Sequence, residues 1–316
     1  ILKSNLTNMM KDNFKYLVIG MGIQGTKRSK IDKKNFIAYV DPFNKKADYK
    51  DILDVPLEIY NSAYVCTPDK NKIDIIKFLL NNKKNVLVEK PLLAIKNITI
   101  KELYNLAKKN KVILYTAYNH RFEPHLKKVK ELIKSKIIGK AYLCNIFYGN
   151  GTSMLVKKSL WKDKSNGVIT DLGSHLLDLI NYLFPLKKTK FFKLTDIQKF
   201  ENTSPDYAKI SYTQKNFQIN LEMTYCMWKN SFYLDILGEK GSIHMNCLCK
   251  WGPSKLIVRK RKKPSGIPEE KNFFLKMKDP TWKEEHEYFK KRVLSKNKIN
   301  NEKKDLWINQ ILSSII

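Results

Sequence analysis

A glycine loop directly after an apolar run is the feature that most constrains this fold. Gly20, Gly22 and Gly25 have the spacing G-x-G-x-x-G, and the preceding residues YLVI are typical of a buried strand. The first glycine permits a tight turn, the second lets a pyrophosphate approach the backbone, and the third lets a helix pack on the strand. The helix would direct free N–H groups at that phosphate. The loop therefore predicts a strand–helix unit that binds a dinucleotide.

An acidic residue closes the next apolar run, FIAYV, at the distance that such a unit requires. Asp41 follows the loop by about 20 residues and can accept hydrogen bonds from ribose hydroxyls, which favours NAD. Asn44, Lys45 and Lys46 come shortly after it and could accommodate a 2′-phosphate. NAD is therefore the predicted cofactor, with NADP as the alternative.

Strand-like and helix-like runs alternate through the first part of the chain. The predicted helices are 73–82 and 98–110, and the predicted strands are 16–20, 36–41, 62–68, 85–91 and 112–118. This alternation predicts an α/β fold with a doubly wound parallel sheet, a Rossmann domain, over residues 14–123. Residues 1–13 are expected to be a short, partly ordered leader.

After about residue 124 the pattern changes to a basic helix followed by period-two runs. Such runs, separated by turn residues, are typical of an antiparallel sheet. Residues 124–316 are therefore expected to form an α+β domain with an open, mostly antiparallel sheet. Two helices are expected after residue 281, and they could pack back on the first domain. Cys247 and Cys249 are expected on one face of a strand, as an i, i+2 pair.

Two further stretches carry candidate chemistry. Lys90 stands before Pro91 at the end of an apolar run, at the sheet edge where open α/β folds bind ligands. Residues 167–184 are a predicted helix, on which Asp171, His175, Asp178 and Tyr182 form one polar stripe. A histidine near an aspartate suits proton transfer. The alternative is a structural histidine hydrogen-bonded in the core.

The charge and the cysteines exclude little by themselves. The formal net charge is +30, but the lysines are spread over nearly every segment, and only residues 258–266 are a basic cluster. Ordinary solvated faces are favoured over a nucleic-acid surface, because no aromatic residues interleave with that cluster. Five cysteines in a long chain do not predict a disulfide framework, and no complete zinc site is present in the sequence.

Taken in order, these motifs resemble those of the glucose–fructose oxidoreductase / inositol dehydrogenase / rhizopine catabolism (Gfo/Idh/MocA) family. The resemblance rests on the glycine loop, Thr67-Pro68, Glu89-Lys90-Pro91, Arg121-Phe122 and Asp171-x-Gly-x-His175-x-x-Asp178. It implies an NAD(P)-dependent oxidoreductase acting on a hydroxyl of a sugar, nucleotide sugar or cyclitol. The sequence departs from the family pattern in two places. At Asp69–Lys72 the family often has a second small residue or proline and a histidine. At Asn166-Gly167 the family often has more glycines.

The resemblance also assigns the site residues. It implies that Lys90, Asp171 and His175 are catalytic and also contact the substrate. Further substrate contacts are expected at Tyr118, Asn119, Arg121 and Trp161. The expected cofactor contacts are Gly20, Gly22, Ile23, Gln24, Gly25, Asp41, Thr67, Pro68, Glu89 and Lys90.

The expected context is a cytoplasmic enzyme without a metal, a nucleic-acid partner or a membrane span. A homodimer or homotetramer through the C-terminal sheet is also expected. Two alternatives stay open at this point. One is a regulatory protein that binds NAD without turnover, and the other is a nucleic-acid binder, suggested by charge alone.

Overall fold

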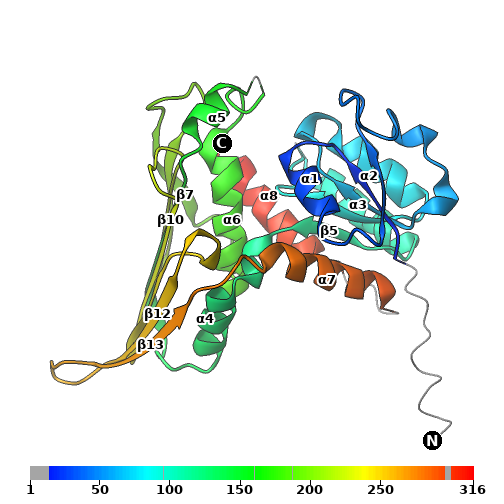
Figure 1. Cartoon of the computed structure of the whole chain (residues 1–316). Coiled ribbons are helices and arrows are strands. Elements are labelled where there is room, and N and C mark those ends of the chain that lie inside the picture. The colour runs from blue at the N-terminus through cyan, green and yellow to red at the C-terminus, as the bar shows by residue number, and fades with distance from the viewer. Residues whose placement is uncertain (1–13, 95, 160, 187, 296–299) are drawn as a thin grey trace, which may run out of the picture. The chain divides into compact units, whose positions relative to one another are not determined.

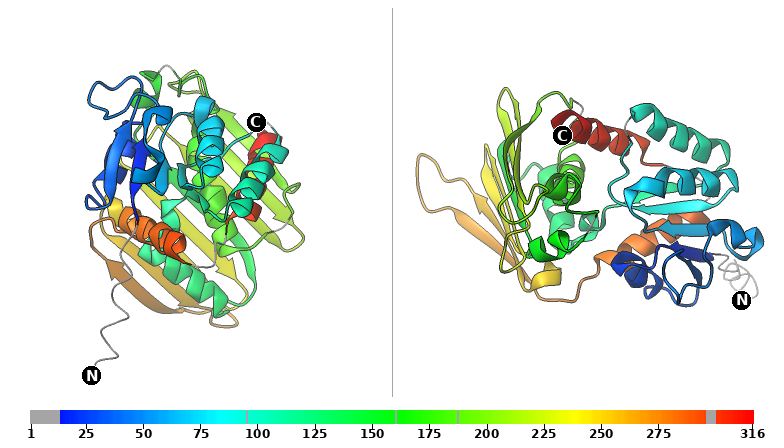
Figure 2. Two further views of the ribbon diagram at one scale, coloured as in Figure 1. Left: turned by 90° about the vertical axis from the view of Figure 1, so that its right-hand side faces the viewer. Right: turned by 90° about the horizontal axis from the view of Figure 1, so that it is seen from above.

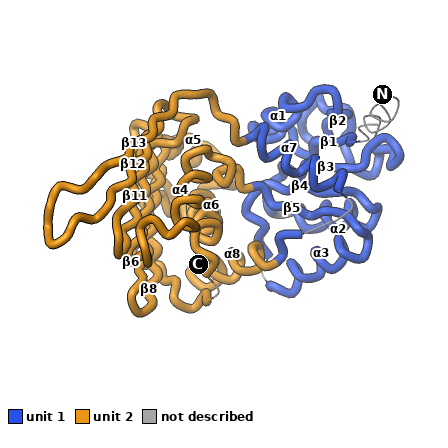
Figure 3. Tube along the Cα trace, turned by 90° about the horizontal axis from the view of Figure 1, so that it is seen from below, with its two compact units in different colours: residues 1–117, 282–302 blue, residues 118–281, 303–316 orange. Residues whose placement is uncertain are grey.

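The computed structural model describes residues 14–94, 96–159, 161–186, 188–295 and 300–316, so the expected leader at 1–13 lies outside the described residues. The chain divides into two compact units (Figure 3). Unit 1 comprises the residues up to Ala117 together with Trp282–Glu302, and unit 2 comprises Tyr118–Thr281 and Lys303–Ile316.

Unit 1 is built on a five-stranded sheet in the order β2-β1-β3-β4-β5, and all of its strand pairs are parallel. The strands are β1 (Tyr16–Ile19), β2 (Phe36–Val40), β3 (Ser62–Val65), β4 (Asn85–Glu89) and β5 (Leu114–Ala117). The order reverses beside β1, and such a switch point is where open α/β sheets bind ligands. The predicted parallel sheet is therefore confirmed.

Helices cover both faces of this sheet (Figure 2). They are α1 (Ile23–Ser29), α2 (Lys72–Asn81), α3 (Asn97–Lys109) and α7 (Thr281–Leu294), with short 3-10 turns at η1 (Ile52–Asp54), η2 (Leu57–Ile59) and η3 (Asp69–Asn71). Phe289 and Val293 of α7 pack against Tyr16, Tyr64 and Tyr115, which alternate onto one face of the strands. A segment from the end of the sequence thus completes the core of unit 1.

Unit 2 is built on an eight-stranded sheet in the order β13-β12-β11-β10-β6-β9-β8-β7. Its strands are β6 (Ala141–Gly149), β7 (Phe192–Gln198), β8 (Tyr207–Gln214), β9 (Phe217–Thr224), β10 (Ser231–Gly238), β11 (Gly241–Asn246), β12 (Ser254–Lys260) and β13 (Glu269–Leu275). Neighbouring strands are antiparallel except β6 and β9, which run parallel. The predicted mostly antiparallel sheet is confirmed.

One face of this sheet is covered by helices (Figure 1). The helices of unit 2 are α4 (Pro124–Lys134), α5 (Ser153–Lys157), α6 (Gly167–Leu183) and α8 (Glu302–Ile315), with 3-10 turns η4 (Asn119–Phe122) and η5 (Cys249–Trp251). Gly173 of α6 lies directly on the sheet, because a Cβ there would be 3.1 Å from the Met223 sulfur and 3.8 Å from Ile210. The apolar side of α6 is therefore pressed against β8 and β9.

One local expectation was wrong, and one strand was not predicted. Cys247 and Cys249 do not share a strand, because β11 ends at Asn246, Cys247 has a φ of +67°, and Cys249 begins η5. Strand β13 was not expected, because EEKNFFL is charged and mostly exposed. It pairs with β12 at the edge of the sheet, where Arg259 contacts Glu270. Among the described residues, no helix has both the length and the apolar character needed to span a membrane.

Candidate functional site

The glycine loop of unit 1 has the close contacts that the sequence predicts. Gly20 has a φ of +94°, and a Cβ on it would lie 2.8 Å from the Cys66 carbonyl oxygen. A Cβ on Gly25 would lie 1.9 Å from the Gly20 carbonyl oxygen, so α1 can approach the loop only with glycine there. Gly22 differs, because a Cβ on it would meet nothing within 4 Å. Its surroundings leave room for a ligand to approach the backbone.

Asp41 joins the end of β2 to this loop. Its carboxylate accepts hydrogen bonds from the backbone N–H of Met21 (2.7 Å), Phe43 (2.9 Å) and Asn44 (3.0 Å). Partial burial raises the pKa of Asp41, but these three donors outweigh burial and hold that pKa below its ordinary value. The carboxylate is therefore charged at neutral pH. It keeps acceptor capacity for a ribose hydroxyl, because two carboxylate oxygens offer about four lone pairs.

The Thr67 hydroxyl also supports a dinucleotide site at this loop. Thr67 follows β3, beside Gly20, and its Oγ1 is buried without a hydrogen-bond partner among the described residues. A buried hydroxyl left unpaired costs about 1–3 kcal/mol, so it is a group that a ligand would satisfy. Open space at Gly22, the charged Asp41 and this hydroxyl together fit a bound dinucleotide.

Two glycine variants separate cofactor binding from folding. Gly22→Ala should leave the thermal midpoint nearly unchanged but weaken NAD binding at least tenfold, because its Cβ enters only the space a pyrophosphate would occupy. Gly25→Ala should lower the thermal midpoint as well, since its Cβ overlaps the Gly20 carbonyl. Calorimetry and NAD titration measure both effects. Unchanged NAD affinity in Gly22→Ala would show that the pyrophosphate does not lie on this loop.

The Glu89-Lys90-Pro91 segment is held by buried charged side chains. Glu89 Oε1 accepts from Arg28 Nε at 2.8 Å. Lys72 Nζ donates to the carbonyl oxygens of Glu89 (3.2 Å) and Pro91 (3.3 Å), and it pairs with Asp69 at 2.5 Å. Hydrogen bonds to the carbonyls on either side of Lys90 fix the backbone that carries it. Lys72 lies in the stretch that departs from the family pattern, and here that stretch stabilises the turn.

In unit 2 the polar stripe of α6 meets aromatic rings and a tyrosine hydroxyl. Asp171 Oδ2 accepts from the hydroxyl of Tyr225 at 3.1 Å. The ring of His175, which is 9% exposed, lies edge-on to Tyr118, with centroids 6.0 Å apart. His175 is also 6.2 Å from the ring of Tyr148 on β6. The histidine is therefore held by packing in one orientation, one helical turn from a carboxylate.

Asp178 lies in an ionic network a turn further along α6. Its carboxylate is 1% exposed, accepts from Arg121 Nε at 2.7 Å, and is 3.9 Å from Lys304 Nζ of α8. Arg121 also lies over the ring of Tyr182, at 5.3 Å. The network joins η4, α6 and α8, so these contacts assign Asp178 and Arg121 a role in holding the helices together.

The remaining predicted residues are distributed as follows. Asn119 is buried and donates to the Thr281 hydroxyl at 2.8 Å. Trp161 is 51% exposed in the turn before α6, and its ring contacts the Lys162 ammonium at 5.5 Å. Lys90 belongs to unit 1, whereas Asp171 and His175 belong to unit 2. Within unit 2, Tyr118 and His175 are brought together, as are Arg121 and Asp178.

Sequence reasoning missed several residues around these sites. Arg28, Lys72, His120, Tyr225 and Lys304 all contact predicted site residues, yet none was predicted. His120 had a visible signal, because it stands between Asn119 and Arg121, two residues that were selected. The others make contacts that no local spacing shows.

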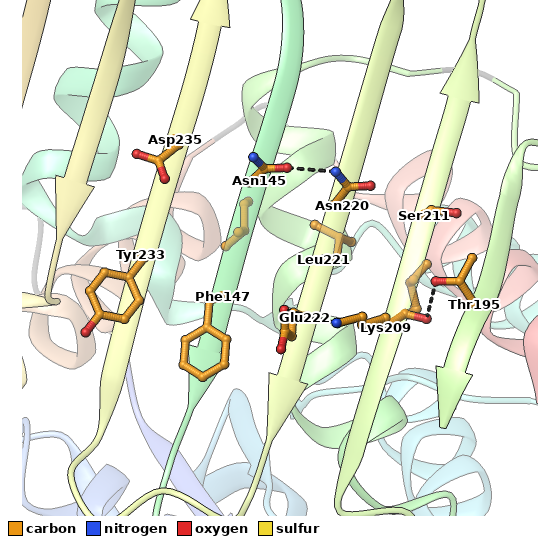
Figure 4. Close-up of a pocket in the computed structure, with 12 residues that line it drawn as sticks. Asn145, Phe147, Thr195, Lys209, Ser211, Asn220, Leu221, Glu222, Tyr233 and Asp235 are labelled. Atoms are coloured by element: carbon orange, nitrogen blue, oxygen red, sulfur yellow. Dashed lines mark hydrogen bonds and ion pairs between the residues drawn. The ribbon is translucent and has the colours of Figure 1, made fainter. Parts of the chain in front are cut away.

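The other face of the eight-stranded sheet carries a hollow of about 360 Å³ (Figure 4). It lies opposite the face that α6 covers, so it does not include His175. Asn220 donates to Asn145 across β9 and β6, and the rings of Phe147 and Tyr233 lie 5.9 Å apart. No group of three or more metal-ligating side chains occurs among the described residues.

Two family models match the chain. Residues 24–118 match an oxidoreductase family with an NAD-binding Rossmann fold, and residues 126–244 match the GFO/IDH/MocA C-terminal domain. The chain belongs to the GFO/IDH/MocA family of oxidoreductases. Its NAD-binding Rossmann domain is therefore the glycine-loop unit described above, and NAD is the cofactor of that domain.

Individual relatives agree with this assignment. A trans-1,2-dihydrobenzene-1,2-diol dehydrogenase of Xenopus laevis is 26% identical over 62% of this chain and 58% of its own length. A glucose-6-phosphate 3-dehydrogenase of Bacillus subtilis is 23% identical over 69% of this chain and 61% of its own. The chain thus aligns with about three fifths of these relatives. A levoglucosan dehydrogenase, solved with NADH and levoglucosan, shares the fold with a TM-score of 0.77, 16% identity and 96% coverage of both chains.

Proposed function

We propose that this protein is a dehydrogenase or reductase that moves a hydride between NAD and a hydroxyl-bearing carbon of a sugar, nucleotide sugar or cyclitol. The observation that carries the proposal is the Asp171–His175 pair on α6, in a family whose other domain binds NAD. The relatives that act on a diol, a sugar phosphate and an anhydrosugar support the substrate class. Nothing in these similarities supports a regulator without turnover.

The residues have distinct roles in this proposal. His175 accepts the proton of the substrate hydroxyl as the C–H bond breaks, because a neutral imidazole is a competent base near neutral pH. Lys90 donates a hydrogen bond to the same oxygen as it becomes a carbonyl, which stabilises the developing negative charge. Asp171, held by Tyr225, orients His175 or binds a neighbouring hydroxyl. NAD, when bound, supplies the nicotinamide C4 that takes the hydride.

The cofactor and substrate contacts follow the same logic. Thr67 and Asp41 offer a hydroxyl and a carboxylate to the dinucleotide, and Asp41 disfavours a 2′-phosphate. Tyr118, Asn119, Arg121 and Trp161 remain candidate substrate contacts, with Arg121 the weakest because its guanidinium already binds Asp178. We also propose that the chain forms a homodimer or homotetramer through the uncovered face of the eight-stranded sheet. A monomer in light scattering would contradict that association.

The test is an absorbance assay at the nicotinamide band together with thermal shift. The cofactors are NAD, NADH, NADP and NADPH, and the substrate panel contains sugars, sugar phosphates, cyclitols and UDP-sugars. We expect stabilisation by NAD or NADH, and a substrate-dependent absorbance change with members of one class. Binding of NAD with no turnover on any class would contradict the enzyme, and stabilisation by NADP alone would contradict the role of Asp41.

A further inference from the structure

A second imidazole lies face to face with the proposed base. The ring centroids of His120 and His175 are 4.2 Å apart and their planes are inclined by 18°. His120 comes from η4 and is 2% exposed, so both rings are withdrawn from water. Protonating both stacked imidazoles at this distance has a high free-energy cost, because two adjacent like charges disfavour each other's ionisation. The protonation state of His120 therefore bears directly on that of His175.

Lys250 determines the protonation state of His120. Its ammonium nitrogen lies 3.1 Å from Nε2 of His120. An ammonium group only donates, so Nε2 must accept, and the imidazole must be neutral with its proton on Nδ1. Charging His120 would remove this acceptor and place a second cation against the ammonium.

The position of Lys250 is itself built into the fold. It lies in η5, which the chain enters after the positive φ of Cys247. The neighbouring Cys249 donates from its backbone N (3.2 Å) and its Sγ (3.0 Å) to the buried carboxylate of Glu123, just beyond η4. The two 3-10 turns that carry His120 and Lys250 are thereby joined at a second point. The Lys250 ammonium also lies 4.5 Å from the ring of Trp251.

Other charged or titratable groups also lie around the ring pair. Tyr148 faces both histidines from β6, and Tyr118 faces His175; burial raises the pKa of both phenols, so they stay neutral. Asp171 and Asp178 lie on α6 itself. Glu123 and Asp279 are on the Lys250 side, and burial raises the pKa of Glu123 although Cys249 and Lys250 oppose that rise. Among the described contacts, Lys250 is a cation in direct contact with the ring pair.

We propose that His120 is a positioning residue for His175, and that Lys250 holds His120 neutral in the Nδ1–H form so that only His175 exchanges a proton with the substrate. The inference rests on the proposed function, in which His175 is the base. Lys250 also places a positive charge one ring away from His175, which favours the unprotonated imidazole that the reaction needs. Neither residue contacts the substrate in this scheme.

The test first measures the tautomers of the two histidines and then the pH dependence of the reaction. Nitrogen-detected NMR of the full chain, with His120→Asn and His175→Asn for assignment, should show His120 as the Nδ1–H tautomer that does not titrate between pH 5 and 8, whether or not a substrate is known. Lys250→Met should switch on titration of His120. It should also move the acid limb of kcat/KM up by about half to one pH unit, because a cation near His175 is removed.

Two variants complete the comparison. Lys250→Arg should restore both the tautomer and the pH profile, and Lys255→Met, which removes an exposed lysine of β12, should change neither. An Nε2–H tautomer in the native protein, or a Lys250→Met protein with unchanged tautomer and profile, would overturn the proposal. A correct tautomer in a protein without turnover would instead place the failure in the proposed function.

Discussion

His175→Asn should lower kcat by about 10²- to 10⁴-fold, the range for removing a general base. Asparagine keeps a polar side chain at this buried position of α6 but cannot accept a proton from the substrate. The Kd for NAD should stay within a factor of about two, because the proposed dinucleotide contacts are all in unit 1. Steady-state kinetics and NAD titration measure the two quantities separately.

Lys90→Met should lower kcat by about 10²- to 10³-fold, since it removes a donor to the oxygen that becomes charged.

His244→Asn is the matched control for His175→Asn. The His244 ring pairs with Asp235 at 2.6 Å on the uncovered face of the sheet, away from His175. That variant should keep native turnover. If His175→Asn retained more than a tenth of native kcat, His175 would not be the base, and the role of the α6 stripe would need another explanation.

Features set by local spacing could be predicted from the sequence. A pattern of a few residues predicts the glycine loop, Asp41 and the strand before Lys90, because tight turns and strand ends require particular residue types. The polar stripe of α6 is visible for the same reason, since a helix repeats every 3.6 residues. These signals were enough to identify the sheet of each unit and the family.

Contacts between distant segments could not be predicted in this way. His120 meets a lysine 130 positions later, and Arg28 pairs with glutamates on β4 and α7. In the sequence TKRSK, Arg28 resembles an exposed basic residue at the end of a helix. Its burial depends on α7, which returns from the end of the chain to cover the sheet. Strand β13 was missed because its charged residues are satisfied across an exposed edge rather than buried.

Arg28→Met should destabilise unit 1 by about 3–5 kcal/mol, the cost of removing one partner from a buried ionic cluster. Arg28 is 1% exposed and lies 2.8 Å from both Glu89 and Glu285, with its guanidinium 4.4 Å from the ring centroid of Trp282. Methionine can fill the volume beside Trp282 but leaves the buried carboxylate of Glu285 and the partly buried carboxylate of Glu89 without this cation. Calorimetry and urea titration measure the loss, which should exceed that of the surface control Arg259→Met, expected at about 0–1 kcal/mol.

The pH dependence of the stability loss in Arg28→Met shows whether unpaired charge or lost packing causes it. Burial already raises the pKa of Glu285, and the nearby Arg28 guanidinium opposes that rise. Without Arg28 the folded-state pKa should rise further above the unfolded value, so the carboxyl binds a proton more readily in the folded protein than in the unfolded one. The stability deficit of Arg28→Met should therefore be largest near pH 8 and shrink as pH falls toward 5. Adding Glu285→Gln should recover part of the loss at pH 8. A deficit independent of pH and unchanged by Glu285→Gln would mean that lost packing, rather than unpaired charge, is the cost of removing Arg28.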